Sequence, residues 1–260
     1  MDEKQIEEIH QIIENEYVKS VYQSIVSLKC GEVFAYEALS RVTKARCSMS
    51  IGEVFQTASQ ADCLWELEKL CRKRALKGAV YKPRKAKLFL NVDGNVMLDD
   101  QFVSGFTKDK IRKYGLKTND VVFEITERSD FNNREQMKDL VKHYKKQGFS
   151  MALDDFGTGY SGLNRLHDLE PRYVKIDYSL IHDIHKDSSQ MSLVEMLVGH
   201  SKNMGYSLIA EGIETKEELE CVIHLGVEYG QGFYLGMPNE HFLETEAEIV
   251  DEIKQYYRKS

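Results

Sequence analysis

Acidic side chains recur in this sequence directly after short apolar runs. Glu37, Glu124, Asp154, Asp155 and Glu211 each close or follow a run of this kind. If the runs are parallel strands of one barrel, their carboxyl ends meet at one face and bring the five carboxylates together. Like charges raise one another's pKa, so this group stays ionised only beside cations. The pattern therefore predicts a site for divalent cations.

The types of ligand atom indicate which cation would bind. Carboxylates and the amide of Asn91 are hard oxygen donors, which suit Mg²⁺ or Mn²⁺ better than zinc. Asp154 and Asp155 are adjacent and so placed to bridge and flank two ions, the arrangement used for in-line phosphoryl displacement. The residue chemistry alone predicts metal-assisted hydrolysis of a phosphoester.

The elements that must position these residues alternate between β-rich and helical segments. Eight strands are expected, at Val21–Leu28, Val33–Leu39, Lys87–Val92, Val121–Thr126, Phe149–Asp154, Tyr173–Ile176, Ser207–Ala210 and near Tyr229–Leu235. Helical patterns lie between them, for example at Trp65–Ala79, Arg134–Gln147, Met191–Met204 and Lys216–Leu225. This rhythm in a chain of 260 residues favours an α/β fold, a TIM-like (β/α)8 barrel. Only Cys30–Glu32 separates the first two strands, so we expect a hairpin and one antiparallel strand near the N-terminus.

The first 17 residues form a separate pattern. Apolar residues recur there at helical spacing, at Ile6, Ile9, Ile12, Ile13 and Tyr17. We expect residues 1–17 to form an amphipathic helix that either caps the domain or links it to another module, and residues 18–260 to form one domain.

Composition narrows the classes of function. The net charge of −7 argues against binding of duplex nucleic acid, which selects basic faces. The basic run Arg72-Lys73-Arg74 lies in a segment that also carries acids, and we interpret it as a solvated helix face. The five cysteines are odd in number and form no Cys-x-x-Cys pair, which is typical of cytosolic thiols. No apolar run reaches the ~18 residues of a membrane span, so we expect a cytoplasmic protein.

Several motifs, in order and spacing, resemble the EAL domain family, the cyclic di-GMP phosphodiesterases of bacteria. The resemblance extends from about Tyr22 to Pro238. It rests on Glu37-Ala-Leu39, Glu124-Ile-Thr-Glu127, Asp154-Asp155-Phe-Gly-Thr-Gly-Tyr-Ser161, Val-Lys175-Ile-Asp177, Ala-Glu211-Gly-Ile-Glu214 and Gln231-Gly-Phe-Tyr. It implies hydrolysis of cyclic di-GMP to linear pGpG by a metal-dependent phosphodiesterase.

The resemblance also implies a role for each matched residue. Two ions of Mg²⁺ or Mn²⁺ would be held by Glu37, Asn91, Glu124, Asp154, Asp155 and Glu211. Lys175 would lie against the attacking water as an orienting and charge-stabilising group, and with Glu37 and Asp154 it forms the expected catalytic set. Since the ordinary pKa of lysine is near 10.4, Lys175 would act as a base only if strongly perturbed.

Substrate contacts and partners follow from the same resemblance. Arg41 would hold a substrate phosphate, and Gln23, Leu39 and Gln231 would contact guanine or ribose edges. Glu127 and Glu214 would orient loops and metal ligands. The loop Phe156–Gly162 would link metal binding to a dimer contact, which implies a homodimer. An N-terminal sensory or GGDEF-type domain, absent from this chain, is a further expected partner.

Two departures from the family pattern and two rival functions remain open. The chain has Gln23-Ser24-Ile25 in place of Gln-Pro-Ile, and Asp93-Gly94 where a proline is common. The first rival is a catalytically silent cyclic di-GMP receptor or protein-interaction module, which usually lacks a metal ligand or the lysine; this sequence has both. The second is a barrel enzyme that abstracts a proton beside a carboxylate, which leaves the glycine loop and the spacing of Arg41 unexplained.

Overall fold

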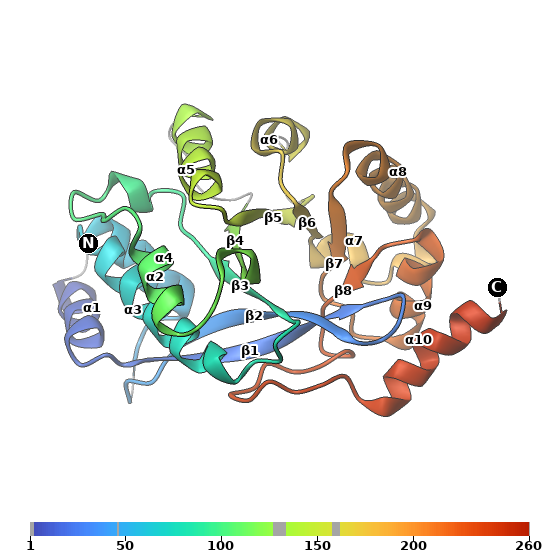
Figure 1. Ribbon diagram of the computed structural model, residues 1–260, viewed down its shortest axis with the longest axis horizontal. Helices are drawn as coiled ribbons and strands as arrows, with labels where there is room; N and C mark the ends of the chain where they lie inside the picture. The colour runs from blue at the N-terminus through green and yellow to red at the C-terminus, as the bar shows by residue number, and fades with distance from the viewer. Residues whose placement is uncertain (1–2, 46, 127–133, 158–161, 260) are drawn as a thin grey trace.

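The computed structural model describes residues 3–45, 47–126, 134–157 and 162–259. Its centre is a closed barrel of eight strands in chain order (Figure 1). The strands are β1 (Val18–Ser27), β2 (Val33–Val42), β3 (Lys87–Asn91), β4 (Val121–Thr126), β5 (Ser150–Phe156), β6 (Tyr173–Ile176), β7 (Ser207–Ala210) and β8 (Tyr229–Gly230). The predicted TIM-like barrel is therefore confirmed.

Strand β1 gives the barrel its one departure from parallel order. It pairs antiparallel with β2 and with β8, and the other neighbouring strands pair in parallel. A tight turn joins β1 to β2, where Gly31 has a φ of 78°. The predicted antiparallel strand near the N-terminus is confirmed.

Helices surround this barrel. They are α1 (Glu3–Glu14), α2 (Ile51–Gln60), α3 (Leu64–Gly78), α4 (Phe106–Lys113), α5 (Arg134–Lys146), α6 (Gly162–Leu169), α7 (Tyr178–Ile181), α8 (Ser188–Met204), α9 (Lys216–Leu225) and α10 (Ala247–Lys259). Figure 1 shows α1 to α4 gathered at one end of the β1–β2 pair and α10 toward the other end. Capping boxes begin α2, at Ser50 and Glu53, and α9, at Thr215 and Glu218.

The barrel interior contains two successive layers of side chains. The lower layer is apolar and takes one residue from each strand: Ile25, Ala35, Phe89, Val122, Ala152, Tyr173, Ile209 and Tyr229. Side chains in a strand return to the same face every second residue, so the next inward position lies two residues further toward the carboxyl mouth of the barrel. In antiparallel β1 this position lies two residues earlier. The resulting upper layer consists of Gln23, Glu37, Asn91, Glu124, Asp154, Lys175, Glu211 and Gln231.

The N-terminal helix is shorter than the predicted 1–17. Helix α1 ends at Glu14, and Glu16 has a left-handed φ of 52°, so Tyr17 lies after the helix. Ile9 and Ile12 are fully buried in a satellite apolar cluster with residues of α2 and α3.

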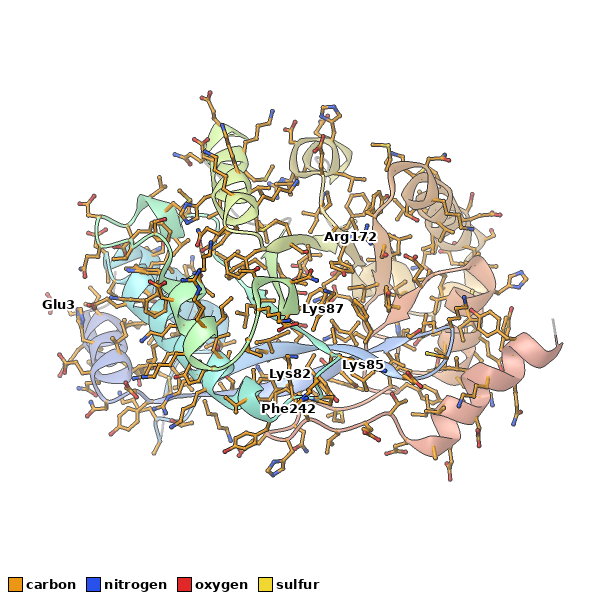
Figure 2. All side chains as sticks on the ribbon, in the orientation of Figure 1. Glu3, Lys82, Lys85, Lys87, Arg172 and Phe242 are labelled. Atoms are coloured by element: carbon orange, nitrogen blue, oxygen red, sulfur yellow. The ribbon has the colours of Figure 1, made fainter. Side chains whose placement is uncertain are left out.

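The last strand is also shorter than predicted, because β8 ends at Gly230 instead of continuing to Leu235. The backbone of Ile213 approaches Gly232 so closely that a Cβ there would lie 2.1 Å from the Ile213 carbonyl oxygen. The chain then turns and runs along β1, where Tyr22 and Asn239 form an isolated bridge. Figure 2 shows Phe242 beside the β1–β2 pair, and its ring centroid lies 4.1 Å from that of Tyr22.

Two sequence expectations concern cysteines and membrane spans. All five cysteines are free thiols. Within the described ranges, no helix combines the length and the apolar character that crossing a membrane requires.

Candidate active site

Lys175 is the centre of the upper polar layer. Its Nζ lies 2.7 Å from Glu211 Oε1, 3.1 Å from Glu124 Oε1, 3.1 Å from Asp154 Oδ1 and 3.2 Å from Glu37 Oε2. The lysine is only 1% exposed. One cation thus faces four carboxylates, three from strands β2, β4 and β5 and one, Glu211, directly after β7.

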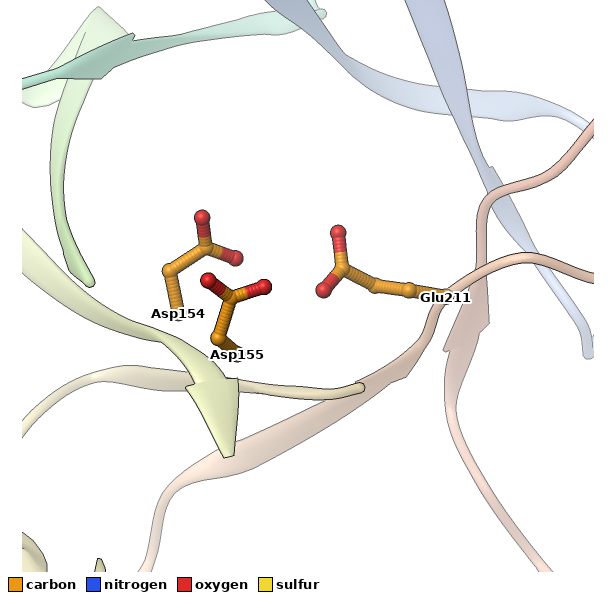
Figure 3. A group of neighbouring side chains, drawn as sticks. All are labelled: Asp154, Asp155 and Glu211. Carbon is orange, nitrogen blue, oxygen red and sulfur yellow. The ribbon is translucent and has the colours of Figure 1, made fainter. Parts of the chain in front are cut away.

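An irregularity in β5 brings a fifth carboxylate to the same place. Adjacent strand residues normally point to opposite faces, but the register of β5 against β6 shifts between Leu153 and Phe156. Asp155 has a left-handed φ of 54° within this bulge. Figure 3 shows Asp154, Asp155 and Glu211 converging, and one oxygen of each lies within 4.8 Å of the others.

Amide side chains fix the orientation of Glu37. Asn91 Nδ2 donates to Glu37 Oε1 at 2.9 Å, and Gln231 Nε2 donates to Glu37 Oε2 at 2.8 Å. Gln231 Nε2 also lies 3.1 Å from Gln23 Oε1, which makes Gln23 and Gln231 buried neighbours of the carboxylate. This amide support for Glu37 was not predicted. A signal for it was present in the sequence, since Gln23, Asn91 and Gln231 each lie two positions from an apolar residue of the lower layer.

The upper polar layer contains more carboxylates than basic groups. Burial opposes ionisation of Glu37, but Lys175 and hydrogen bonds from Gln231 and Asn91 hold its pKa below the usual range. The pKa of Glu124 is raised well above its usual value by burial and then by Glu37. Burial opposes the charge of Lys175, yet Asp154 and Glu124 raise its pKa well above the usual value. Lys175 is therefore a fixed cation here, and it does not offset all the carboxylates.

The Glu124 carboxylate provides a test of whether a metal fits this site. It is completely buried, and neither of its oxygens accepts a hydrogen bond from the described residues. Lys175 Nζ is close enough to attract Oε1 but lacks the alignment of a hydrogen bond. Buried carboxylates without such partners are costly unless they bind a cation. The donor set fits a hard divalent ion.

The remaining predicted residues lie around this layer. Leu39 and Arg41 continue β2 beyond Glu37 and line a cavity of about 320 Å³ together with Asn91. Arg41 is half-buried, and its Nη1 donates to the Ser40 carbonyl at 3.0 Å. Glu214 is exposed in the segment after β7. Glu127 lies outside the described residues, as do residues 158–161 of the predicted loop Phe156–Gly162.

Glu218 connects two loops through backbone hydrogen bonds, and this role was not predicted from the sequence. It is fully buried and accepts hydrogen bonds from the backbone nitrogens of Asp183, Glu214 and Thr215, at 2.9, 2.8 and 3.0 Å. These contacts join the segment after β6 to the segment after β7. The capping-box spacing of Thr215 and Glu218 was the available signal.

The interpretation of Arg72 as part of a solvated face is wrong. Arg72 is 3% exposed and forms an ion pair of 2.5 Å with Glu68, which is 2% exposed. Lys73 and Arg74 of the same run are partly exposed and pair with Glu16. A helix turns by about 100° per residue, so adjacent basic residues reach different environments.

The fold and the site together define an α/β barrel with a lysine-centred acidic layer at its carboxyl mouth. The chain belongs to the EAL domain family, whose model matches residues 6–238. It is 30% identical over 237 residues to the probable cyclic di-GMP phosphodiesterase PdeB of Escherichia coli K12, covering 89% of this chain and 45% of that protein. The chain spans less than half the length of the curated relatives it matches.

Solved structures show the same likeness. BlrP1 of Klebsiella pneumoniae, in a complex with calcium and cyclic di-GMP, superposes with a TM-score of 0.79 at 27% identity, over 88% of this chain and 57% of that chain. A manganese complex of BlrP1 matches equally well in TM-score. A standalone EAL protein of Vibrio cholerae O395, in its cyclic di-GMP-bound form, gives 0.74 at 29% identity, over 89% of this chain and 97% of that chain.

Proposed function

We propose that this chain is a metal-dependent phosphodiesterase that hydrolyses cyclic di-GMP to linear pGpG. The observation that carries the proposal is the buried layer in which Lys175 faces Glu37, Glu124, Asp154 and Glu211. Family membership and the names of the relatives support this choice of substrate.

Two ions of Mg²⁺ or Mn²⁺ would be held by Glu37, Asn91, Glu124, Asp154, Asp155 and Glu211. When bound, they supply Lewis-acid activation of water and neutralise phosphate charge. The Asn91 amide nitrogen already donates to Glu37, which leaves its oxygen as the ligand atom. The calcium and manganese complexes of BlrP1 support this class of cation.

In the reaction, a water molecule gives up a proton and its oxygen bonds to phosphorus as the bond from phosphorus to one 3′ oxygen breaks. The leaving 3′ oxygen gains a proton, which balances the one that the water gave up. Lys175 stays protonated and holds positive charge against the phosphorane-like transition state, instead of removing a proton. The apolar layer below excludes water from beneath the site. Arg41 would hold a substrate phosphate at the rim, with Leu39, Gln23 and Gln231 as contacts to the dinucleotide.

Three further proposals concern the whole protein. Residues 18–260 would form the phosphodiesterase domain, with residues 1–17 as a capping or linking helix. Glu127 and Glu214 would orient loops of the site. The active form would be a cytoplasmic homodimer, and an N-terminal sensory or GGDEF-type domain would regulate it where the natural protein carries one.

Anion-exchange analysis of the products tests the proposed reaction. Incubation of cyclic di-GMP with the protein and Mg²⁺ or Mn²⁺ is expected to yield pGpG, and both EDTA and Glu37→Ala are expected to abolish it. Tight binding of cyclic di-GMP without metal-dependent cleavage would instead support the receptor function.

A further inference from the structure

The backbone immediately after β3 is hydrogen-bonded to one buried carboxylate, that of Glu68. Asp93 N donates to Glu68 Oε1 at 2.7 Å, two residues after the proposed ligand Asn91. Val92 N donates to the Glu124 carbonyl at 2.9 Å, so this segment also touches the strand of a second proposed ligand. The position of the Asn91 amide thus depends on a residue of helix α3.

Glu68 is in turn held by Arg72, one turn later on the same helix. Their ion pair is almost completely buried, with an Nη2 to Oε2 distance of 2.5 Å. The guanidinium carbon of Arg72 lies 5.4, 5.1 and 5.6 Å from the ring centroids of Trp65, Phe123 and Tyr144. Phe123 directly precedes Glu124 on β4, so the same ion pair contacts β4 as well as the segment after β3.

The segment after β3 borders a cavity. The space of about 320 Å³ beside the segment is lined by Asn91, Asp93, Glu68 and Arg72, among others. Side-chain packing is therefore incomplete on that side of the backbone. The hydrogen bond from Asp93 N to Glu68 Oε1 is a directed contact that holds the backbone beside this cavity.

We infer that Glu68 is a positioning residue for the proposed metal site, placing Asn91 through its hydrogen bond to the Asp93 backbone, with Arg72 as its charge partner. The inference rests on the proposed function. Neither residue touches the reacting atoms. Partners that orient metal ligands typically change metal affinity by about 10- to 100-fold when they are removed.

The alternative is that the pair only stabilises the fold. Buried ion pairs can often be replaced by apolar residues of similar volume without loss of stability. Glu68→Leu/Arg72→Met removes both charges and the acceptor for Asp93 N. Glu68→Gln/Arg72→Met removes both charges but keeps an amide oxygen at that position. Comparing these two variants separates the positioning hydrogen bond from the charge pair.

The experiment is calorimetric titration of Mn²⁺ into EDTA-treated, dialysed protein without nucleotide. We expect Mn²⁺ affinity to fall about 10-fold or more in Glu68→Leu/Arg72→Met, and to stay near wild type in Glu68→Gln/Arg72→Met. At saturating Mn²⁺, kcat for cyclic di-GMP should largely recover in the first variant. Val194→Ala, a truncation at a buried position of α8, controls for lost stability and should leave Mn²⁺ affinity unchanged.

Glu68→Asp is the second test if the apolar variant does not fold. It keeps the charge beside Arg72 but withdraws the carboxylate from Asp93 N, and it should also weaken Mn²⁺ binding. Wild-type Mn²⁺ affinity in every folded variant that lacks this hydrogen bond would overturn the inference while leaving the proposed function intact. A wild-type protein that binds no Mn²⁺ would overturn both.

Discussion

Two buried charge clusters, one on helix α3 and the other inside the barrel, differ in their balance of charge. Glu68 and Arg72 form a one-to-one pair surrounded by aromatic rings. Lys175, by contrast, faces four carboxylates, and one of these, Glu124, accepts no hydrogen bond from the residues that the structure describes. The opposite charges of Glu68 and Arg72 offset each other, so this pair requires no further ion. Buried carboxylates in excess of their basic partner require an additional cation. This difference supports our proposals that the Glu68–Arg72 pair has a supporting role and that the layer around Lys175 holds cations.

The largest effect is expected from removing the central cation. Lys175→Met should lower kcat for cyclic di-GMP by about 10²- to 10³-fold at saturating Mn²⁺, because a group that stabilises transition-state charge is lost. Lys82→Met is a matched control, since Lys82 is also buried but donates to the Ala86 carbonyl at the amino-terminal end of β3. Near-wild-type turnover in Lys175→Met would remove the lysine from the mechanism.

Breaking the balanced pair should affect stability more than chemistry. Arg72→Met leaves Glu68 buried without its partner and should lower the free energy of unfolding by about 3 kcal/mol. Urea denaturation would measure this change. The double variant Glu68→Gln/Arg72→Met should recover most of the loss, and equal losses in the single and double variants would contradict the account.

Removing one charge from the layer around Lys175 should raise the free energy of unfolding, whereas breaking the Glu68–Arg72 pair should lower it. In EDTA, Glu124→Gln should raise the free energy of unfolding by about 1 to 2 kcal/mol, because it removes an uncompensated buried charge. For a chain of this size each kcal/mol corresponds to about 2–4 °C in Tm, which thermal melts resolve. Glu218→Gln is the control of opposite sign, since backbone donors hold the pKa of that buried carboxyl below its usual value despite burial. A destabilised Glu124→Gln protein would mean that Lys175 already balances the site.

The smallest effect concerns pH. The pKa of Glu124 in the folded protein is raised above its ordinary value of 4.5, so the metal-free protein loses stability as pH rises from that value upward. Glu124→Gln should therefore gain stability over wild type as pH rises from about 5 to about 8 in EDTA. Glu218 has a lowered pKa and should show the reverse, with stability lost as pH falls below 4.5. A pH-independent difference between wild type and Glu124→Gln would contradict the predicted titration.

The barrel was predictable from the alternation of strand and helix patterns, and the convergence of the carboxylates from acidic residues at the carboxyl ends of parallel strands. Lys175, Gln23 and Gln231 entered the prediction only through the family resemblance. In the structure, alternation along each strand places Glu37 two residues beyond Ala35 and Lys175 two beyond Tyr173. The bulge at Asp155 escaped prediction because it depends on a backbone conformation that the residue type does not dictate.

Long-range contacts account for the other misses. The end of β8 depends on the approach of Ile213 to Gly232, and the burial of Arg72 depends on aromatic residues from β4 and α5. In both cases the contacting residues lie far apart in the sequence. Roles for Arg41 and Leu39 came only from family resemblance, and they stay predictions until a complex with the dinucleotide is characterised.

Anomalous diffraction at the manganese absorption edge, from crystals soaked in Mn²⁺, tests the central claim most directly. The account predicts anomalous peaks within the upper polar layer, bounded by Glu124, Asp154, Asp155 and Glu211, and their loss in crystals of Asp154→Asn. Fully occupied Mn²⁺ elsewhere on the protein, with none in this layer, would contradict it.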